Sequence, residues 1–288
     1  MIRVQLTGGL GNQLFIWAAA HSLQNEFSAR VRLIVVHDSN TRKDRPIEIQ
    51  PISKTCSHGI TVSSSRLFGL FLRIIDKFHL ERFQLSGRAL KSIGIYSFND
   101  PVSIPVFEYA KPRFIRCYFQ RTDIVESSWE ILSDEFITAL RSVDLSTLGM
   151  LSPSNSIHIR RGDFLGLSTT HGVLTDEYFK ENLNTSFPIY LCTDDFHPEE
   201  LLRRKLKGNA IFTPNQADTW QTLKIFYDSN HFIGSNSTLS WWAAFLRVKA
   251  KKELTCLPLP WTCIDLGYEN ALRILGVDYK KSEFLNAC

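Results

Sequence analysis

The order of apolar, polar and glycine residues at the start of the chain constrains its fold most. Apolar and polar residues alternate over 2–6, which is the two-residue period of a short strand. A glycine-rich turn follows at 7–12, apolar residues recur at helical spacing over 14–23, and a second apolar strand spans 31–36. A strand, a glycine turn, a helix and a strand in this order open a doubly wound α/β domain. We expect Asn12 to cap the start of that helix.

A second α/β half is predicted to begin near residue 150, after a segment rich in Ser, Thr and Pro. Alternation over 156–160 indicates a strand buried on one face, and it points His158 and Arg160 to the same side. Ligands of open α/β sheets bind at the carboxyl ends of the strands, where a planar, permanently charged guanidinium suits a diphosphate. The alternative is an edge strand followed by a solvated cluster of charged residues. We place the two domains at 1–148 and 149–288.

Composition excludes several classes of function. Hydrophobic residues make up 44% and charged residues 22% of the 288 positions, as in a globular protein with a sizeable core. The net charge of +4 is mild, and no basic stripe indicates a nucleic-acid partner. No segment is long and apolar enough to span a membrane, and we expect no signal peptide ahead of the first strand. The six cysteines form no CxxC pair, and we interpret them as reduced thiols. We therefore expect a cytoplasmic protein, at most loosely associated with the inner membrane face.

The N-terminal glycine turn does not fit the two best-known phosphate-binding motifs. Gly9 and Gly11 match the first two glycines of the dinucleotide fingerprint, but Leu14 stands where the third belongs. No Lys-Ser or Lys-Thr pair follows, as a Walker loop would require. A glycine turn before a helix still offers backbone N–H groups to an anion or a sugar hydroxyl, and Asn12 and Gln13 add amides there. A purely structural tight turn is the alternative.

The Thr193-Asp194-Asp195 run follows a predicted strand over 189–192. Adjacent strand residues point to opposite faces, so the two carboxylates would not readily chelate one ion. One of them accepting hydrogen bonds from a ribose or a guanine edge is the functional interpretation, and a helix N-terminal carboxylate is the structural one. No His/Cys cluster has metal-ligand spacing either, and we predict no metal site.

The run from Ser235 to Thr238 lies at a predicted strand-to-helix junction. Small hydrogen-bonding groups at the positive end of a helix make a good phosphate cradle, although Ser and Asn are also ordinary N-caps. Trp241 and Trp242 follow in the helix. They could stack on a sugar or a base, but we expect them to belong to the core.

Five motifs in a fixed order carry a family resemblance. They are GGLGNQLF at 8–15, YFQ at 118–120, HIRRGD at 158–163, TDD at 193–195 and SNSTLSWWAA at 235–244. Together they make the chain similar to the α-1,2-fucosyltransferase family over most of its length.

The resemblance implies a GT-B architecture, in which two Rossmann-like domains face a cleft. The N-terminal domain would take the acceptor and the C-terminal domain GDP-β-L-fucose. The implied reaction is inverting transfer of L-fucose to the 2-hydroxyl of a terminal galactoside in a glycan precursor, with no cofactor and no obligatory metal. Arg160 would bind the pyrophosphate and stabilise the departing GDP. The donor-binding residues would be His158, Arg160, Arg161, Asp194, Asp195, Ser235, Asn236, Ser237 and Thr238. The acceptor side would include Gly9, Asn12, Gln13 and Gln120.

Physical chemistry agrees with the role implied for Arg160. Breaking the bond between a sugar and a diphosphate builds negative charge on the leaving oxygen. A metal-free enzyme must answer that charge with fixed cations and N–H dipoles, each typically worth about 3 kcal/mol. No residue stands out as the general base for the acceptor hydroxyl, and the candidates are Asp163, His171 and Asp38.

The sequence departs from the family pattern in places that leave Arg160 untouched. Thr193 stands where Ser is expected, Ala243 stands where Gly is expected, and the segment 226–231 lacks an expected Cys. Two other functions remain open. One is a GDP-fucose-dependent transferase that makes a different linkage. The other is a non-catalytic protein that binds a GDP-sugar or a glycan.

Overall fold

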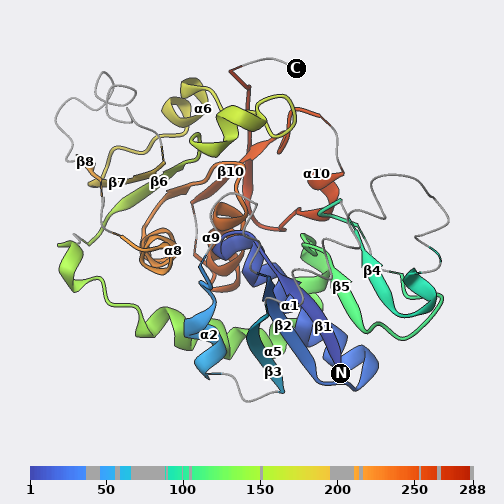
Figure 1. The fold of residues 1–288 in the computed structure, drawn as a ribbon. Helices are drawn as coiled ribbons and strands as arrows, with labels where there is room; N and C mark the ends of the chain where they lie inside the picture. The colour runs from blue at the N-terminus through green and yellow to red at the C-terminus, as the bar shows by residue number, and fades with distance from the viewer. Residues whose placement is uncertain are drawn as a thin grey trace. The chain divides into compact units, whose positions relative to one another are not determined.

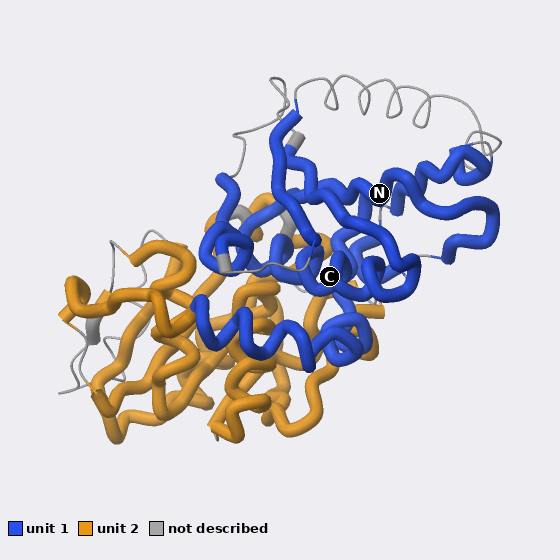
Figure 2. Tube along the Cα trace, turned by 90° about the horizontal axis from the view of Figure 1, so that it is seen from below, with its two compact units in different colours: residues 1–139 blue, residues 140–288 orange. Residues whose placement is uncertain are grey.

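The chain folds into two compact units. Unit 1 comprises Met1–Ala139 and unit 2 comprises Leu140–Cys288 (Figure 2). The division falls inside a helix, whereas the sequence placed a boundary at 148/149 in the linker that follows. This computed structural model describes residues 1–36, 46–55, 59–65, 88, 90–98, 100–103, 106–149, 152–194, 211–213, 217–252, 254–264 and 267–285.

Unit 1 is built on a parallel sheet of five strands in the order β3-β2-β1-β5-β4. Its strands are β1 (Ile2–Leu6), β2 (Val31–Val36), β3 (Ile60–Ser65), β4 (Ile95–Ser97) and β5 (Phe114–Arg116). The helices among its described residues are α1 (Leu10–Phe27), α2 (Gln50–Thr55) and α5 (Thr122–Ser142). α1 is apolar almost all round and packs on β1 and β2 (Figure 1). The predicted strand, glycine turn, helix and strand are all present.

The start of α1 differs from the prediction in one detail. The helix begins at Leu10, and its N-cap is Gly9, with no side-chain capping bond. Asn12 is therefore the third residue of the helix rather than its cap. The glycine run explains this, because it lets the backbone turn into the helix before a capping side chain is reached.

Unit 2 is built on a parallel sheet of six strands in the order β11-β10-β9-β6-β7-β8. Its strands are β6 (Asn155–Ile159), β7 (Ile189–Thr193), β8 (Ile211–Phe212), β9 (Phe232–Ile233), β10 (Thr255–Leu259) and β11 (Asp278–Lys281). In the described part of this unit, the α-helices are α6 (Asp176–Glu181), α8 (Thr219–Asp228), α9 (Thr238–Lys249) and α10 (Tyr268–Ala271). Short 3-10 turns span Ser146–Leu148 and Asp163–Leu167. Two parallel α/β units confirm the predicted fold class.

Unit 2 has an apolar core between its sheet and its helices. Ile157, Ile159 and Leu191 from the strands pack with Tyr178 and Phe179 of α6. Trp241 and Trp242 are fully buried in α9, which confirms their assignment to the core. The indole N–H of Trp241 donates to the Leu272 carbonyl at 2.7 Å, so the one polar atom of this side chain is satisfied.

Arg247 of α9 is fully buried, which no local sequence pattern indicates. Its guanidinium donates to the carbonyls of Phe226 at 3.1 Å and Ser229 at 2.5 Å and to the Thr255 hydroxyl at 2.8 Å. It therefore satisfies carbonyls at the end of α8, which a helix leaves without intrahelical partners. Burial lowers the pKa of Arg247 to about 10, still high enough to keep it charged.

The cysteines are less uniform than expected. The thiols of Cys117, Cys192 and Cys256 are free and buried, as predicted. Burial raises their pKa values to about 11, about 12 and about 11 respectively, which keeps them protonated and unreactive. Cys263 is disulfide-bonded, so the expectation that every cysteine is reduced was wrong. Across the described ranges, no helix is long and apolar enough to cross a bilayer.

Candidate functional site

The carboxyl edge of the unit 2 sheet brings three of the predicted motifs together. β6 pairs with β7 on one side and with β9 on the other. Ile159 is in register with Thr193, so Arg160 and Asp194 leave the sheet side by side. The run that begins at Ser235 leaves it from β9. Parallel strands bind ligands at this edge, which makes it the candidate site.

Arg160 and Asp194 form an ion pair. Nη1 of Arg160 lies 3.0 Å from Oδ2 of Asp194, and the two side chains are 26% and 28% exposed. The other carboxylate oxygen accepts the backbone N–H of Arg161 at 2.7 Å. The guanidinium predicted to meet a diphosphate is therefore already held in place at the strand end.

His158 holds the end of β6 to the first turn of α9. Its side chain is buried, and Nδ1 lies 2.7 Å from the Ser240 hydroxyl of α9. The same hydroxyl accepts the backbone N–H of Ser235 at 3.0 Å. Burial, reinforced by the charge of Arg160, lowers the pKa of His158 to about 3. The imidazole is therefore neutral at physiological pH, and it ties β6 to the start of α9.

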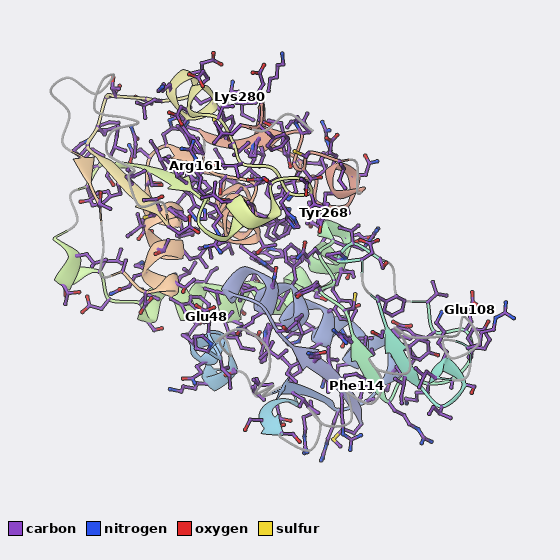
Figure 3. The ribbon with its side chains drawn as sticks, turned by 45° about the horizontal axis from the view of Figure 1, so that its top comes forward. Glu48, Glu108, Phe114, Arg161, Tyr268 and Lys280 are labelled. Carbon is purple, nitrogen blue, oxygen red and sulfur yellow. The ribbon has the colours of Figure 1, made fainter. Side chains whose placement is uncertain are left out.

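Arg161 points away from this edge. Nη2 donates to the Leu174 carbonyl at 2.9 Å and to a carboxylate oxygen of Asp176 at 2.6 Å. The side chain is buried among the packed side chains of unit 2 (Figure 3). Adjacent residues at a strand end point to opposite faces, which explains why only one of the two arginines joins the site. We therefore assign Arg161 a structural role in place of the donor-binding one expected from the sequence.

α9 begins next to the ion-paired edge. Ser237 is its N-cap, and the Ser237 hydroxyl accepts the Leu239 N–H at 3.3 Å. A helix of twelve residues leaves first-turn N–H groups available to an anion. Ser235 and Asn236 are buried behind this turn, whereas Thr238 is partly exposed.

Asn236 has an unusual hydrogen-bond pattern. Its Nδ2 donates to the carbonyls of His171 at 2.9 Å and Gly172 at 3.2 Å. Two carbonyl partners fix the orientation of the amide, because only the nitrogen can donate. Its Oδ1 has no partner among the described residues, although the side chain is only 3% exposed. Asn236 therefore offers an acceptor, which suits a hydroxyl or N–H group and not a phosphate oxygen.

The candidate base His171 lies in the same cluster as Arg160. The Arg160 guanidinium carbon is 5.9 Å from the centre of the Phe164 ring, and the Phe164 and His171 rings are 5.4 Å apart. His171 Nδ1 lies 3.1 Å from the Thr170 hydroxyl. The side chain of Asp163, and all of Asp38 and Asp195, lie outside the described part of the chain.

The acceptor-side candidates gather at the equivalent edge of unit 1. Gly9 caps α1, and Asn12 accepts a hydrogen bond from Nε2 of Gln120 at 3.0 Å. Gln13 is buried, and its Nε2 donates to the carbonyls of Gly8 at 2.8 Å and Pro46 at 3.0 Å. Its Oε1 accepts the backbone N–H groups of Glu48 at 2.9 Å and Ile49 at 3.3 Å. Four bonds to the backbone make Gln13 a structural clamp.

Comparison with known proteins identifies the family of the chain. The model of Glycosyl transferase family 11 matches residues 73–260, which is more than half of the chain. The chain belongs to this family. The family resemblance seen in the sequence is thereby confirmed, and the protein is a glycosyltransferase.

Two curated relatives extend the likeness to nearly the whole chain. The O-antigen biosynthesis glycosyltransferase WbnK of Escherichia coli is 24% identical, over 89% of this chain and 93% of the relative. An α-1,2-colitosyltransferase of Escherichia coli is also 24% identical, over 91% of this chain and 92% of the relative. Among solved structures, the E. coli heptosyltransferase WaaC with ADP matches at a TM-score of 0.48 and 10% identity, over 97% of this chain and 92% of that one. The fucosyltransferase NodZ from Bradyrhizobium matches at 0.47 and 13% identity, over 85% and 92%.

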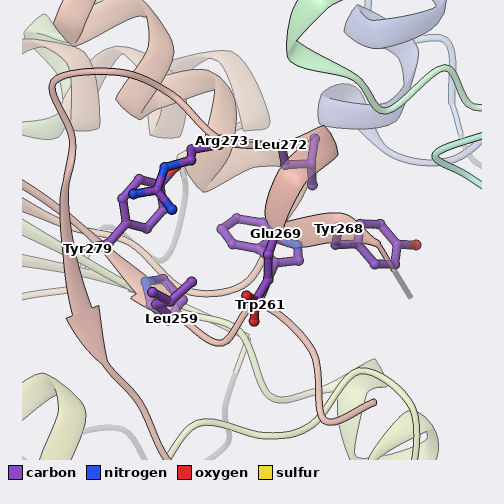
Figure 4. A pocket seen from close by; sticks show the side chains of 8 residues that line it. Leu259, Trp261, Tyr268, Glu269, Leu272, Arg273 and Tyr279 are labelled. Atoms are coloured by element: carbon purple, nitrogen blue, oxygen red, sulfur yellow. The ribbon is translucent and has the colours of Figure 1, made fainter. Parts of the chain in front are cut away.

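Other features of this family 11 chain are poorer candidates for a site. No group of three or more His, Cys, Asp or Glu side chains in the described ranges could hold a metal. A cavity of about 10 Å³ lies beside β10, where Arg273 lies against the ring of Tyr279 and where Trp261 and Glu269 also line the wall (Figure 4). That volume has room for about one water molecule, far less than a sugar requires.

Sequence reasoning missed the side chains that hold the motif residues of this family 11 chain in place. Ser240 holds His158, Asp176 holds Arg161, and Phe164 lies between Arg160 and His171. For Ser240 a signal existed, since it belongs to the motif that begins at Ser235 and lies in the first turn of α9. For Asp176 there was none, because the contact crosses fifteen residues of loop and helix start.

Proposed function

We propose that this glycosyltransferase moves L-fucose from GDP-β-L-fucose to the 2-hydroxyl of a terminal galactoside, with inversion at the anomeric carbon. The acceptor is a precursor of a surface polysaccharide or oligosaccharide. Membership of the family supports the donor. The linkage has support from a relative that is named as an α-1,2-transferase, and the acceptor from one named for O-antigen biosynthesis.

The observation that carries this proposal is the pairing of a held guanidinium with a helix start at one strand edge. Arg160 is fixed by Asp194 at the end of β6, and α9 begins at the end of the neighbouring β9. A fixed cation and first-turn N–H groups are the features that a departing diphosphate needs. Both are held by contacts within the protein itself, so little reorganisation is required during the reaction.

In the mechanism that follows, Arg160 and the α9 N-terminus stabilise the charge that builds on the leaving GDP. The sugar passes through an oxocarbenium-like transition state as the acceptor oxygen attacks the opposite face. We assign the proton of the acceptor hydroxyl to His171, because its ring and the Arg160 guanidinium contact the same Phe164 ring. His158 cannot take this role, since its imidazole is buried and its pKa is about 3.

On the acceptor side we propose the edge of unit 1 formed by Gly9 and the Asn12–Gln120 pair. Amides at a strand edge donate and accept hydrogen bonds, which suits the hydroxyls of a galactoside. Phe119 supports a special role for this segment, since its φ of 54° lies in the left-handed region that non-glycine residues rarely adopt. Gln13 holds the turn from behind.

A second candidate donor has a specific observation in its favour. One relative is named as a colitosyltransferase, so the donor sugar varies among proteins as similar to this chain as 24% identity. Transfer of another deoxysugar through the same Arg160 and α9 features is therefore the alternative, within the same reaction class.

The test is incubation of the purified protein with GDP-fucose and a panel of galactosides. We expect GDP release that depends on the acceptor and a product whose linkage analysis gives α-1,2. Activity should persist in a chelator, because charge stabilisation is assigned to Arg160 and N–H groups. GDP release with GDP-colitose as donor, but not with GDP-fucose, would identify the alternative donor. Binding of GDP-fucose without release, with every acceptor, would favour a non-catalytic binding protein and overturn the proposal.

A further inference from the structure

We propose that Asp194 is a positioning residue, which sets the orientation of Arg160, and that Gly162 is required to make room for it. This inference rests on the proposed function, in which Arg160 acts on the departing diphosphate. It gives the second residue of the Thr-Asp-Asp run a task other than contact with the nucleotide.

The two oxygens of Asp194 bind two consecutive residues of the neighbouring strand end. Oδ2 contacts the Arg160 guanidinium at 3.0 Å, and Oδ1 accepts the Arg161 backbone N–H at 2.7 Å. The carboxylate therefore fixes both the direction of the side chain and the course of the main chain that carries it. A guanidinium has five N–H donors in a rigid plane, so it can hold this carboxylate and face an anion at the same time.

The position of the carboxylate depends on a glycine. A Cβ atom at position 162 would lie 2.8 Å from Oδ2 and 3.0 Å from Cγ of Asp194. Real Cβ atoms essentially never approach another atom within 3.0 Å, so any residue other than glycine would push Oδ2 of Asp194 away. Gly162 has a φ of −45° and a ψ of −75°, which alanine also adopts. The requirement for glycine at this position is therefore one of space.

Charge argues against direct contact between Asp194 and the diphosphate. A carboxylate beside a phosphate raises the energy of both unless a cation separates them. Here Arg160 is that cation, at 3.0 Å from the carboxylate. Asp194 should therefore matter for catalysis through Arg160, and more in the transition state than in the bound ground state.

The first measurement is the steady-state kinetics of Asp194→Asn. The amide keeps the shape of the side chain but loses the ionic bond to Arg160. We expect kcat to fall about ten- to a hundredfold, as misplacement of a catalytic group by ~1 Å does, while KM for the donor changes little. Gly162→Ala should show the same pattern with a smaller drop in kcat, because it displaces the carboxylate without removing it.

Asp176→Asn is the matched control. It breaks an ion pair of 2.6 Å to the arginine next in sequence, in the same unit. That pair is structural, so we expect a lower melting temperature with kcat unchanged at temperatures where the variant is folded. An equal loss of kcat in Asp176→Asn would mean that any damage near the strand end lowers activity, and the specific role of Asp194 would be lost.

Chemical rescue separates positioning from general support of the fold. Millimolar guanidinium ion should restore part of the activity of Arg160→Ala, because Asp194 is left to hold the added cation where the side chain was. The double variant Arg160→Ala/Asp194→Ala should not be rescued. Rescue of both variants to the same extent would overturn the proposal.

Two further readouts keep this inference apart from the proposed function. Calorimetric titration with GDP should give similar affinities for the parent protein and Asp194→Asn. Much weaker GDP binding by the variant, with kcat unchanged, would make Asp194 a nucleotide contact and refute its positioning role. A crystal structure of Asp194→Asn should show the Arg160 guanidinium displaced, whichever donor the enzyme uses. An unmoved guanidinium would overturn the inference even if fucose transfer were proved.

Discussion

The carboxyl edges of the two sheets are built from similar parts but use them differently. At the edge of unit 1 the polar motif side chains bind one another and the backbone, with Gln13 making four such bonds and Asn12 joined to Gln120. At the edge of unit 2, Arg160 is half-buried in an ion pair, and Asn236 keeps a buried acceptor atom without a partner in the described ranges.

The difference between the two edges indicates which side chains can contribute free energy to ligand binding. A side chain whose hydrogen bonds all go to its own backbone stabilises the fold and has little left for a ligand. A buried acceptor without a partner costs free energy until a ligand or a water satisfies it. The electrostatic and hydrogen-bonding capacity of the molecule is therefore greater at the edge of unit 2, which fits a donor site there and a weaker acceptor site in unit 1.

The largest expected effect is the loss of transfer in Arg160→Ala. Removing the fixed cation should lower kcat by about 10³-fold, as the loss of a preorganised charge-stabilising donor does. Arg160→Lys should recover little, because a point charge does not reproduce the planar group that Asp194 holds. The measurement is GDP release under saturating donor. An active Arg160→Ala enzyme with an unchanged circular dichroism spectrum would contradict the assigned role.

A change in unit 1 should act on stability instead. Gln13→Ala leaves two carbonyls and two N–H groups of the backbone without their partner. We expect the free energy of unfolding to fall by about 3 kcal/mol, since buried groups left unsatisfied cost that much together. Urea denaturation measures this, and kcat of the folded variant at low temperature should stay near that of the parent.

Gln13→Glu is the matched control for that change. It preserves size and the two bonds accepted by Oε1, but it replaces the amide that donates to the carbonyls of Gly8 and Pro46. Stability should fall here too. If instead kcat fell while stability held in both variants, Gln13 would be a site residue and the contrast between the two edges would fail.

The sequence was sufficient for elements whose pattern is local. The strand, turn and helix at the N-terminus, the strand that carries Ile157 and Ile159, and the buried Trp241 and Trp242 followed from periodicity and side-chain character. The direction of Arg161 did not, since it depends on Asp176, fifteen residues away and brought near by a loop. The prediction for Asn12 was wrong because the glycine turn lets the helix begin three residues earlier than a cap at Asn12 would require.

The sequence also could not predict which polar side chains have all their hydrogen bonds taken up by the protein itself. Nothing local says that Gln13 reaches Pro46, Glu48 and Ile49, because those contacts cross more than thirty residues. Whether a polar residue of a motif binds substrate or holds the fold is decided by such distant partners. Motifs therefore located the two edges, and the three-dimensional contacts divided their residues between structure and chemistry.

Acidification should weaken unit 2 through His158. Its folded-state pKa of about 3 lies below the ordinary value of 6.5. At a pH between these two pKa values, His158 is protonated in the unfolded chain but neutral in the folded chain. The contribution of the neutral His158 to the free energy of unfolding is therefore fully present above pH 6.5 and is lost as the pH falls. The loss should reach about 2 kcal/mol between pH 6.5 and 4.5, at 1.36 kcal/mol for each pH unit below the unfolded pKa.

The variant His158→Asn isolates this contribution. Its amide can still meet the Ser240 hydroxyl from the position of Nδ1, and it does not titrate. The acid limb of its stability curve, measured by thermal unfolding from pH 7 to 4.5, should be shallower than that of the parent. It should not become flat, because burial also lowers the pKa of His231. An unchanged acid limb would show that His158 is protonated in the folded protein.

The smallest effect tests the unpaired oxygen of Asn236, with Asn155 as its control. Both residues are 3% exposed, but both polar atoms of the Asn155 amide have partners. Its Nδ2 donates to the Asn184 carbonyl at 2.8 Å, and its Oδ1 accepts the His231 backbone N–H at 3.2 Å. Either change to Ala should lower stability. Only Asn236→Ala should also weaken donor binding, by about tenfold, the value of one hydrogen bond.

Titration with GDP and with GDP-fucose locates the group that Asn236 accepts from. Equal weakening for both ligands would place a ribose hydroxyl or a guanine N–H against Oδ1. Weakening for GDP-fucose alone would place a sugar hydroxyl there, and would make this side chain a determinant of which deoxysugar is transferred. If neither ligand bound more weakly than to Asn155→Ala, a water would satisfy the oxygen, and the edge of unit 2 would resemble that of unit 1 more closely than the contacts suggest.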